Sequence, residues 1–70
     1  MRYEYEIEPR LLDIGGGWRL RLLEDGIIPS GGEYPLSAFA EAGHRADAEK
    51  LAFLTAEQEG VAWITLKLSQ

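Results

Sequence analysis

Three glutamates near the start of the chain are the first side chains whose spacing suggests chemistry. Glu4, Glu6 and Glu8 lie two residues apart, and on a strand they share one face at intervals of about 6.6–6.8 Å. Paired carboxylates act as acid and base in glycosidases, but that reaction also needs a cleft, which a domain this small scarcely encloses. Arg19 and Arg21 are also two residues apart, and they carry the opposite charge. We therefore expect a solvated, ion-paired face.

Other reactive residue types occur singly. His44 is the sole histidine and cysteine is absent, so neither a metal-ligand spacing nor a catalytic dyad is indicated. Ser30 lies in Pro-Ser-Gly-Gly, not in the Gly-x-Ser-x-Gly elbow of hydrolases. Gly15-Gly16-Gly17 comes before a predicted strand, whereas a phosphate loop leads into a helix. We therefore predict no catalytic residue, no cofactor and no metal.

Length and charge narrow the classes of protein further. The chain has 70 residues and a formal net charge of −5, so residues 1–70 form one small domain, and binding to nucleic acid through clustered Lys and Arg is not expected. No segment reaches the roughly 20 apolar residues that span a bilayer, and no signal peptide is visible. We expect a soluble, cytoplasmic protein. Because a core this small is weak and no disulfide supports it, self-association as a homodimer is the default expectation.

Alternation predicts three strands. Residues 3–8 place Tyr and Ile on one face and Glu on the other, and residues 18–23 place Trp and Leu opposite Arg. Asp25-Gly26 is a strong hairpin signal, and residues 27–34 form the return strand. Pro29 and Gly31-Gly32 interrupt that strand, which suits a sheet edge with a bulge or twist at the glycines.

The remaining segments predict a connection and two helices. Leu11, Leu12 and Ile14 are expected to pack under the sheet edge. A short helix is predicted over 36–42, and the main helix begins at Arg45, with an apolar stripe formed by Ala48, Leu51, Leu54 and Thr55. Residues 61–68 allow two interpretations, because they alternate like a fourth strand but also continue the helix through Gly60 at a cost of about 1 kcal/mol.

Three blocks of the sequence resemble a known pattern. They are Gly15–Gly26 (GGGWRLRLLEDG), Gly31-Gly32 with Pro35, and Glu59–Ile64 (EGVAWI). The pattern is similar to that of small uncharacterised bacterial and phage-borne proteins with a domain of unknown function. The resemblance implies a three-stranded sheet and a helix that continues through Trp63, and it implies no activity. The predicted fold is therefore α+β, a three-stranded antiparallel sheet packed by a C-terminal helix, with a β-β-β-α-β order as the alternative.

Surplus apolar residues point to an interface. Phe53, Trp63, Ile64 and Leu68 exceed what one face of a small sheet absorbs, so we expect them to contact a partner, either a second copy of the chain or another protein. The leading hypothesis is a small non-enzymatic interaction module that acts as a homodimer. The alternatives are an acidic inhibitor that mimics nucleic acid through its glutamate row, and an enzyme with a dimer-interface pocket near Tyr34, His44 and Trp63.

Overall fold

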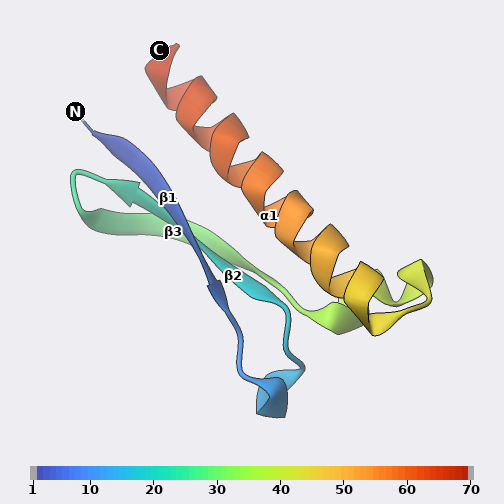
Figure 1. The fold of residues 1–70 in the computed structure, drawn as a ribbon. Coiled ribbons are helices and arrows are strands. Elements are labelled where there is room, and N and C mark those ends of the chain that lie inside the picture. Colours follow the sequence, from blue (N-terminus) through green and yellow to red (C-terminus); the bar gives the residue numbers. More distant parts are fainter. Residues whose placement is uncertain (1, 70) are drawn as a thin grey trace.

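The chain forms a three-stranded sheet covered on one face by a long C-terminal helix (Figure 1). The computed structural model describes residues 2–69, apart from the side chain of Pro29. The elements in chain order are β1 (Tyr3–Pro9), the 3₁₀ helix η1 (Leu12–Ile14), β2 (Trp18–Glu24), β3 (Ile27–Tyr34), the 3₁₀ helix η2 (Leu36–Ala42) and α1 (Arg45–Leu68). The predicted α+β class and the three antiparallel strands are confirmed.

β1 and β2 pair antiparallel, with their glutamates and arginines on the same outer face, as predicted. Glu6 lies opposite Arg21 and Glu8 opposite Arg19, so the charged residues share the face away from the helix. A shift of one residue would bury these charges, which is why the alternation fixes the register. On the other face Leu20 and Leu22 are buried and form the core with the half-buried residues Tyr5, Ile7, Tyr34 and Trp63 and the buried Ala56.

The β2–β3 hairpin turns at Asp25-Gly26, where both residues have positive φ, as tight hairpin turns require. The turn is tied to β1, because the Arg2 backbone N–H donates to the Asp25 carboxylate over 2.7 Å. The strand order β1-β2-β3 places β3 at an edge, as predicted. The expected bulge at Gly31-Gly32 is wrong, since the pairing irregularity lies between Leu22 and Glu24.

The β1–β2 connection does not pack under the sheet. Leu11, Leu12 and Ile14 are exposed, which contradicts the expectation from their hydrophobicity. Backbone carbonyls hold this loop instead, because the Arg10 guanidinium donates to the carbonyl oxygens of Gly16 and Ile14 over 2.7 and 3.2 Å. The Arg10 side chain and backbone hydrogen bonds within the loop therefore hold it, and its apolar side chains stay exposed.

The C-terminal segment is one continuous helix. α1 spans 24 residues and passes through Gly60 without interruption, so the alternative of a fourth strand over 61–68 is wrong. The preceding segment forms η2, which has a kink at Phe39 and ends at Gly43. α1 crosses the sheet on its apolar face, and the start of β1 lies at the same end of the molecule as the end of α1 (Figure 1).

Small side chains on α1 face the sheet. The buried residues of the helix are Ala48, Ala52, Ala56 and Gly60, spaced four apart, which places them on one helix face. A Cβ added at Gly60 would lie 2.6 Å from the Cγ of Tyr5, so the helix backbone lies directly on the tyrosine ring. The predicted inward stripe is wrong in its largest members, because Leu51 and Leu54 are exposed.

Two aromatic pairs hold the helix against the sheet on either side of the contact between Gly60 and Tyr5. The rings of Trp18 and Phe53 meet edge to face at 5.0 Å, and those of Tyr3 and Trp63 at 5.6 Å. The Trp18 indole N–H also donates to the Glu49 carbonyl oxygen over 3.0 Å. Edge-to-face pairs contribute about 0.5–1.5 kcal/mol beyond the burial of their area.

We predict that Gly60→Val destabilises the fold, because a side chain there overlaps the Tyr5 ring. Overpacking of this kind costs about 1–3 kcal/mol, which is measured as the change in free energy of unfolding in urea. Lys50→Val, on the exposed side of α1, is the control. It should lower the free energy of unfolding only by the difference in helix propensity between lysine and valine, about 0.5 kcal/mol. An equal loss in both variants would contradict the close contact.

Candidate functional site

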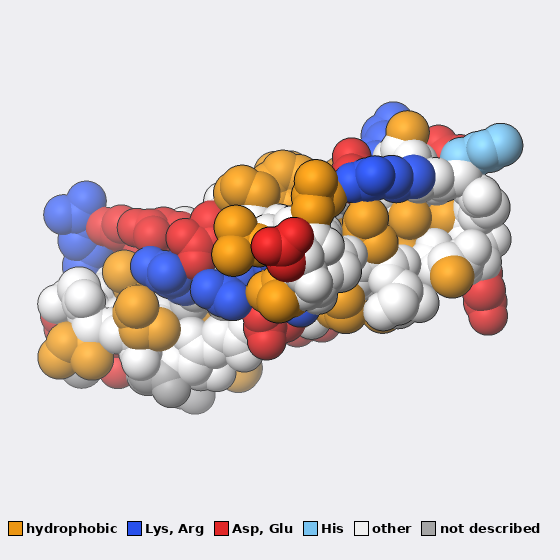
Figure 2. Space-filling view, turned by 90° about the horizontal axis from the view of Figure 1, so that it is seen from below, with side chains coloured by type: hydrophobic (Ala, Val, Ile, Leu, Met, Phe, Trp, Pro, Cys, Tyr) orange, Lys and Arg blue, Asp and Glu red, His pale blue; other side chains and the backbone are white. Residues whose placement is uncertain are grey.

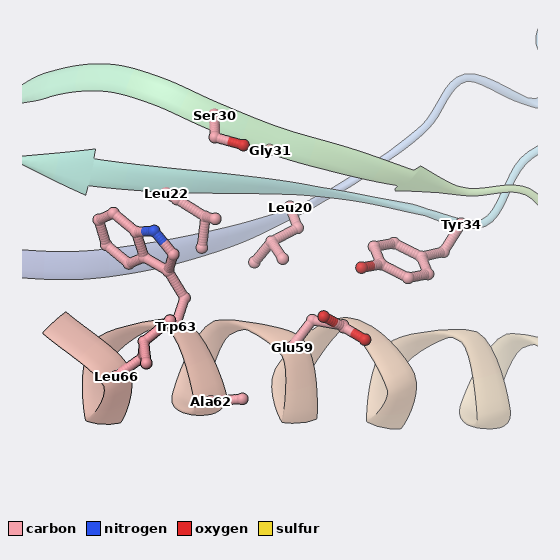
Figure 3. Close-up of a pocket in the computed structure, with 9 residues that line it drawn as sticks. All are labelled: Leu20, Leu22, Ser30, Gly31, Tyr34, Glu59, Ala62, Trp63 and Leu66. Carbon is pink, nitrogen blue, oxygen red and sulfur yellow. The ribbon is translucent and has the colours of Figure 1, made fainter.

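A groove of about 350 Å³ lies between the helix and the edge of the sheet (Figure 3). It forms because α1 lies over β1 and β2 more than over β3. Its floor is formed by Leu20 and Leu22 of β2. The walls come from two elements, which are β3 (Ser30, Gly31, Tyr34) and α1 (Glu59, Ala62, Trp63, Leu66).

The two ends of the groove differ in polarity. Trp63 and Leu66 lie at one end, near Leu22, and are apolar apart from the indole nitrogen (Figure 3). At the other end Glu59 extends from α1 toward the ring of Tyr34 (Figure 3). Burial, and to a lesser extent the negative charge of Glu59, raise the pKa of the Tyr34 hydroxyl above its usual 10.0. Tyr34 therefore stays a neutral donor and acceptor at physiological pH.

His44 does not belong to this groove. It precedes the first turn of α1, its side chain is exposed and makes no capping hydrogen bond, and the histidine projects at one end of the molecule (Figure 2). Trp63 lies nineteen positions further along the helix, about 28 Å at 1.5 Å per residue. The hypothesis of one pocket near Tyr34, His44 and Trp63 is therefore wrong for His44, whereas the structure brings Tyr34 and Trp63 together.

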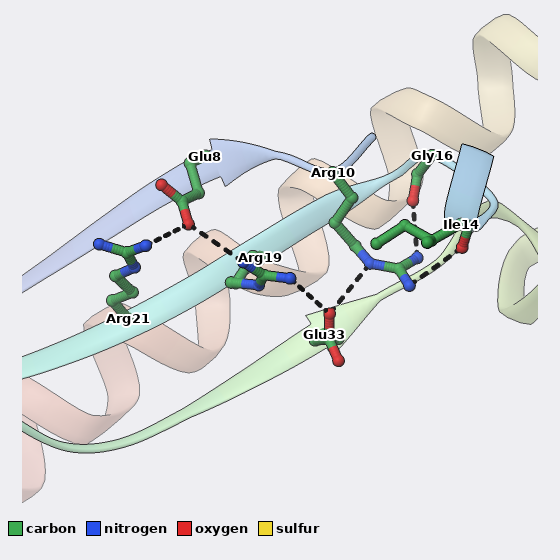
Figure 4. Close-up of polar contacts among 7 residues, drawn as sticks. All are labelled: Glu8, Arg10, Ile14, Gly16, Arg19, Arg21 and Glu33. Carbon is green, nitrogen blue, oxygen red and sulfur yellow. Dashed lines mark hydrogen bonds and ion pairs between the residues drawn. The ribbon is translucent and has the colours of Figure 1, made fainter. Parts of the chain in front are cut away.

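The outer face of the sheet is an ion-paired surface (Figure 4). Glu8 lies 2.7 Å from Arg21 and 3.6 Å from Arg19, and Glu33 lies 3.1 Å from Arg19 and 3.2 Å from Arg10. Hydrogen bonds from Arg19 and then Arg10 lower the pKa of the Glu33 carboxyl below its usual range. The predicted pairing is confirmed for Glu8.

The other two members of the glutamate row differ from Glu8. The partner of Glu4 is Arg2, and Glu6 has no ion pair within the part of the chain described. Acidic and basic side chains are interspersed in the space-filling view (Figure 2). A mimic of nucleic acid needs unpaired carboxylates at regular spacing, whereas Glu4 and Glu8 of this row are both ion-paired.

The outer side of α1 carries a second apolar surface, which we call the outer stripe. It consists of Leu51, Leu54, Gln58, Val61, Thr65 and Leu68. The exposed fractions of its four aliphatic side chains are 45% for Leu51, 42% for Leu54, 49% for Val61 and 68% for Leu68. The sheet cannot cover these side chains, because α1 already packs on it through Ala52 and Ala56.

The four residues predicted to form an interface lie in different environments. Phe53 and Trp63 pack against the sheet within the same chain, Ile64 is half-buried, and Leu68 is exposed. Only Leu68 belongs to the outer stripe. The spacing of Leu51, Leu54, Val61 and Leu68 is visible in the sequence, but hydrophobicity alone predicts that Leu51 and Leu54 face the sheet.

Comparison of the chain with models of protein families, with curated proteins and with solved structures finds no match. Within residues 2–69, no three His, Cys, Asp or Glu side chains gather in a way that would hold a metal ion. In the same range, α1 and the shorter helices lack the apolar length needed to cross a membrane.

We predict that Glu33→Gln makes the stability of the protein less sensitive to acid. The folded-state pKa of Glu33 is lowered from 4.5, so its contribution to stability is present at pH values above 4.5 and is lost as the pH falls from there through the lowered folded-state pKa. Urea unfolding across this window should show a smaller loss in the variant. Glu41→Gln, at an exposed carboxylate without an ion pair in the described chain, should behave like the parent protein.

We also predict that Glu59→Gln lowers the pKa of Tyr34 without restoring its usual value. The substitution removes the charge effect and leaves the larger effect of burial. The ring carbon resonances of Tyr34 in a pH titration by NMR report this shift. An unchanged Tyr34 titration in Glu59→Gln would show that the two groups do not face each other.

Proposed function

We propose that this chain is a non-enzymatic protein-interaction module that acts as a homodimer through the outer stripe of α1. The single observation that carries the proposal is the spacing of the stripe. Its members follow at intervals of three, four, three, four and three residues, which is the repeat of a helix that packs along another helix. Leu54, Val61 and Leu68 follow one another at seven-residue intervals, so they occupy the same position of the repeat. Leu51, three residues before Leu54, occupies the second position that faces a partner helix.

Polar members of the stripe favour a specific dimer over a general sticky surface. Gln58 and Thr65 lie at positions equivalent to Leu51. Buried polar residues at such positions lower stability but select the register and the number of helices, because they need a hydrogen-bonding partner. A single defined pairing therefore suits this stripe better than open-ended association.

The charges at the start of α1 favour an antiparallel pair. Asp47 lies seven residues before Leu54, so a parallel dimer would place the two Asp47 carboxylates against each other. In an antiparallel dimer Leu51 faces the partner's Leu68 and Gln58 faces the partner's Val61, with the two-fold axis near the middle of the stripe. The helix dipoles then also oppose each other favourably.

The thin core supports the need for a partner. The fold extends only 13 Å along its shortest axis, and none of the large side chains described is fully buried. A domain this small gains about 3–5 kcal/mol from its own core, so burial of the outer stripe adds a substantial share of its stability. The lack of cysteine fits a cytoplasmic location, which is part of the proposal.

We predict that Leu54→Glu dissociates the dimer, because it places two charges in an apolar contact. Sedimentation equilibrium should show the dissociation constant rising at least about 100-fold, or about 2.7 kcal/mol. Leu12→Glu is the matched control, since it makes the same change at an exposed leucine of η1 and should leave the dimer intact. A parent protein that stays monomeric at millimolar concentration would disprove the proposal.

Cysteine variants determine the direction of the pair. The chain contains no cysteine, so any disulfide must come from the introduced residue. An oxidised mixture of Leu51→Cys and Leu68→Cys chains should yield the mixed disulfide dimer. Leu51→Cys alone should not cross-link, because its two copies lie at opposite ends of an antiparallel pair, and efficient cross-linking would show a parallel one.

A further inference from the structure

We propose that the groove binds an extended peptide segment of a partner protein, which adds to the free edge of β3 and inserts two side chains. One inserted side chain is apolar, and the other, two residues away, is a lysine or arginine. This inference goes beyond self-association and uses a different surface, since Glu59 and Trp63 are not members of the outer stripe.

The edge of β3 offers a backbone to pair with. The sheet order leaves β3 with β2 on one side and no strand on the other among residues 2–69. Ser30 and Gly31 belong both to this edge and to the wall of the groove. A strand that pairs there lies beside α1, with alternate side chains directed into the groove, which is how peptides bind by strand addition.

The cationic side chain is assigned from the polar end of the groove. Glu59 is exposed, and its carboxylate makes no hydrogen bond or ion pair with the described residues, unlike the carboxylates of Glu8, Glu33 and Glu49. The neutral hydroxyl of Tyr34 lies beside it and can accept a hydrogen bond. An unpaired carboxylate with an adjacent hydroxyl and aromatic ring suits an ammonium or guanidinium group.

The apolar side chain is assigned from the opposite end. Trp63 and Leu66 line this end above the buried Leu22, and Leu66 is more than half exposed. The Trp63 ring already has the Lys67 ammonium 6.0 Å from its centre, so this end disfavours a second cation and favours an aliphatic or aromatic group.

The spacing of the two ends matches a strand. Glu59 and Trp63 are one helical turn apart, a rise of about 6.0 Å for four residues. Alternate side chains of a strand are about 6.6–6.8 Å apart. An apolar residue and a cation separated by one residue therefore reach both ends together, which defines the recognised pattern.

A second copy of this chain does not supply that pattern. The two edge strands span Tyr3–Pro9 and Ile27–Tyr34, and neither contains a lysine or arginine. The net charge of −5 also favours approach of a cationic partner over another acidic chain. Ser30 and Gly31 of β3 line the groove (Figure 3), which suits a peptide that lies along this edge.

NMR titration of the labelled protein tests the proposal. The probe is a blocked pentapeptide in which leucine and arginine are separated by one threonine and flanked by threonines. At millimolar peptide we expect shifts of the amides of residues 30–33 and of the Trp63 indole. The same peptide with citrulline, which is uncharged, should bind roughly threefold weaker or more. Glu59→Gln should remove this preference, whereas Glu57→Gln, on the other flank of α1, should preserve it.

Several results would overturn the proposal. These are no shifts in residues 30–33, equal affinity for the arginine and citrulline peptides, or an unchanged preference in Glu59→Gln. If blocked arginine alone binds as tightly as the pentapeptide, strand addition is wrong. If the residue 30–33 signals change with protein concentration alone, a second copy occupies the edge. Leu54→Glu should retain peptide binding, so failure of the dimer and failure of this site are distinguishable.

Discussion

The contact of Gly60 with Tyr5 is the constraint on which the rest of the structure depends. It brings the helix backbone against the ring of a sheet residue, and the alanines one, two and three turns earlier continue the same close approach. In this fold the sheet supplies the bulk of the core and the helix supplies a flat surface. The large side chains of α1 consequently lie on its flanks or on its outer side. On the flanks, Phe53 and Trp63 extend back to the sheet.

Both proposed surfaces follow from this arrangement. Because small residues occupy the inner face of α1, Leu51, Leu54, Val61 and Leu68 remain outside and belong to the outer stripe. Because the helix lies over β1 and β2, the β3 side of the sheet stays open beneath Ala62 and Leu66. The module thus presents one apolar helix face suited to a second copy, and one groove with a carboxylate suited to a cationic strand.

Alternation in the sequence predicted the sheet well, because its period of two defines both the strands and the outward direction of Arg19 and Arg21. The inner face of α1 was mispredicted, since hydrophobicity favours Leu51 and Leu54 over Ala52 and Ala56. Packing decided otherwise, because the Tyr5 ring lies directly against the helix backbone at Gly60 and leaves no room for a side chain there. The groove could not be predicted, since it depends on the sideways position of the helix, which no local pattern specifies.

The order of the strands also has a consequence for folding. Each strand pairs with its neighbour in sequence, so β1, β2 and β3 can form a sheet before α1 docks on it. Leu20 and Leu22 lack their cover until α1 docks, and Tyr3 meets Trp63 only at that stage. Exposed apolar surface of this kind makes a partly folded chain prone to aggregate.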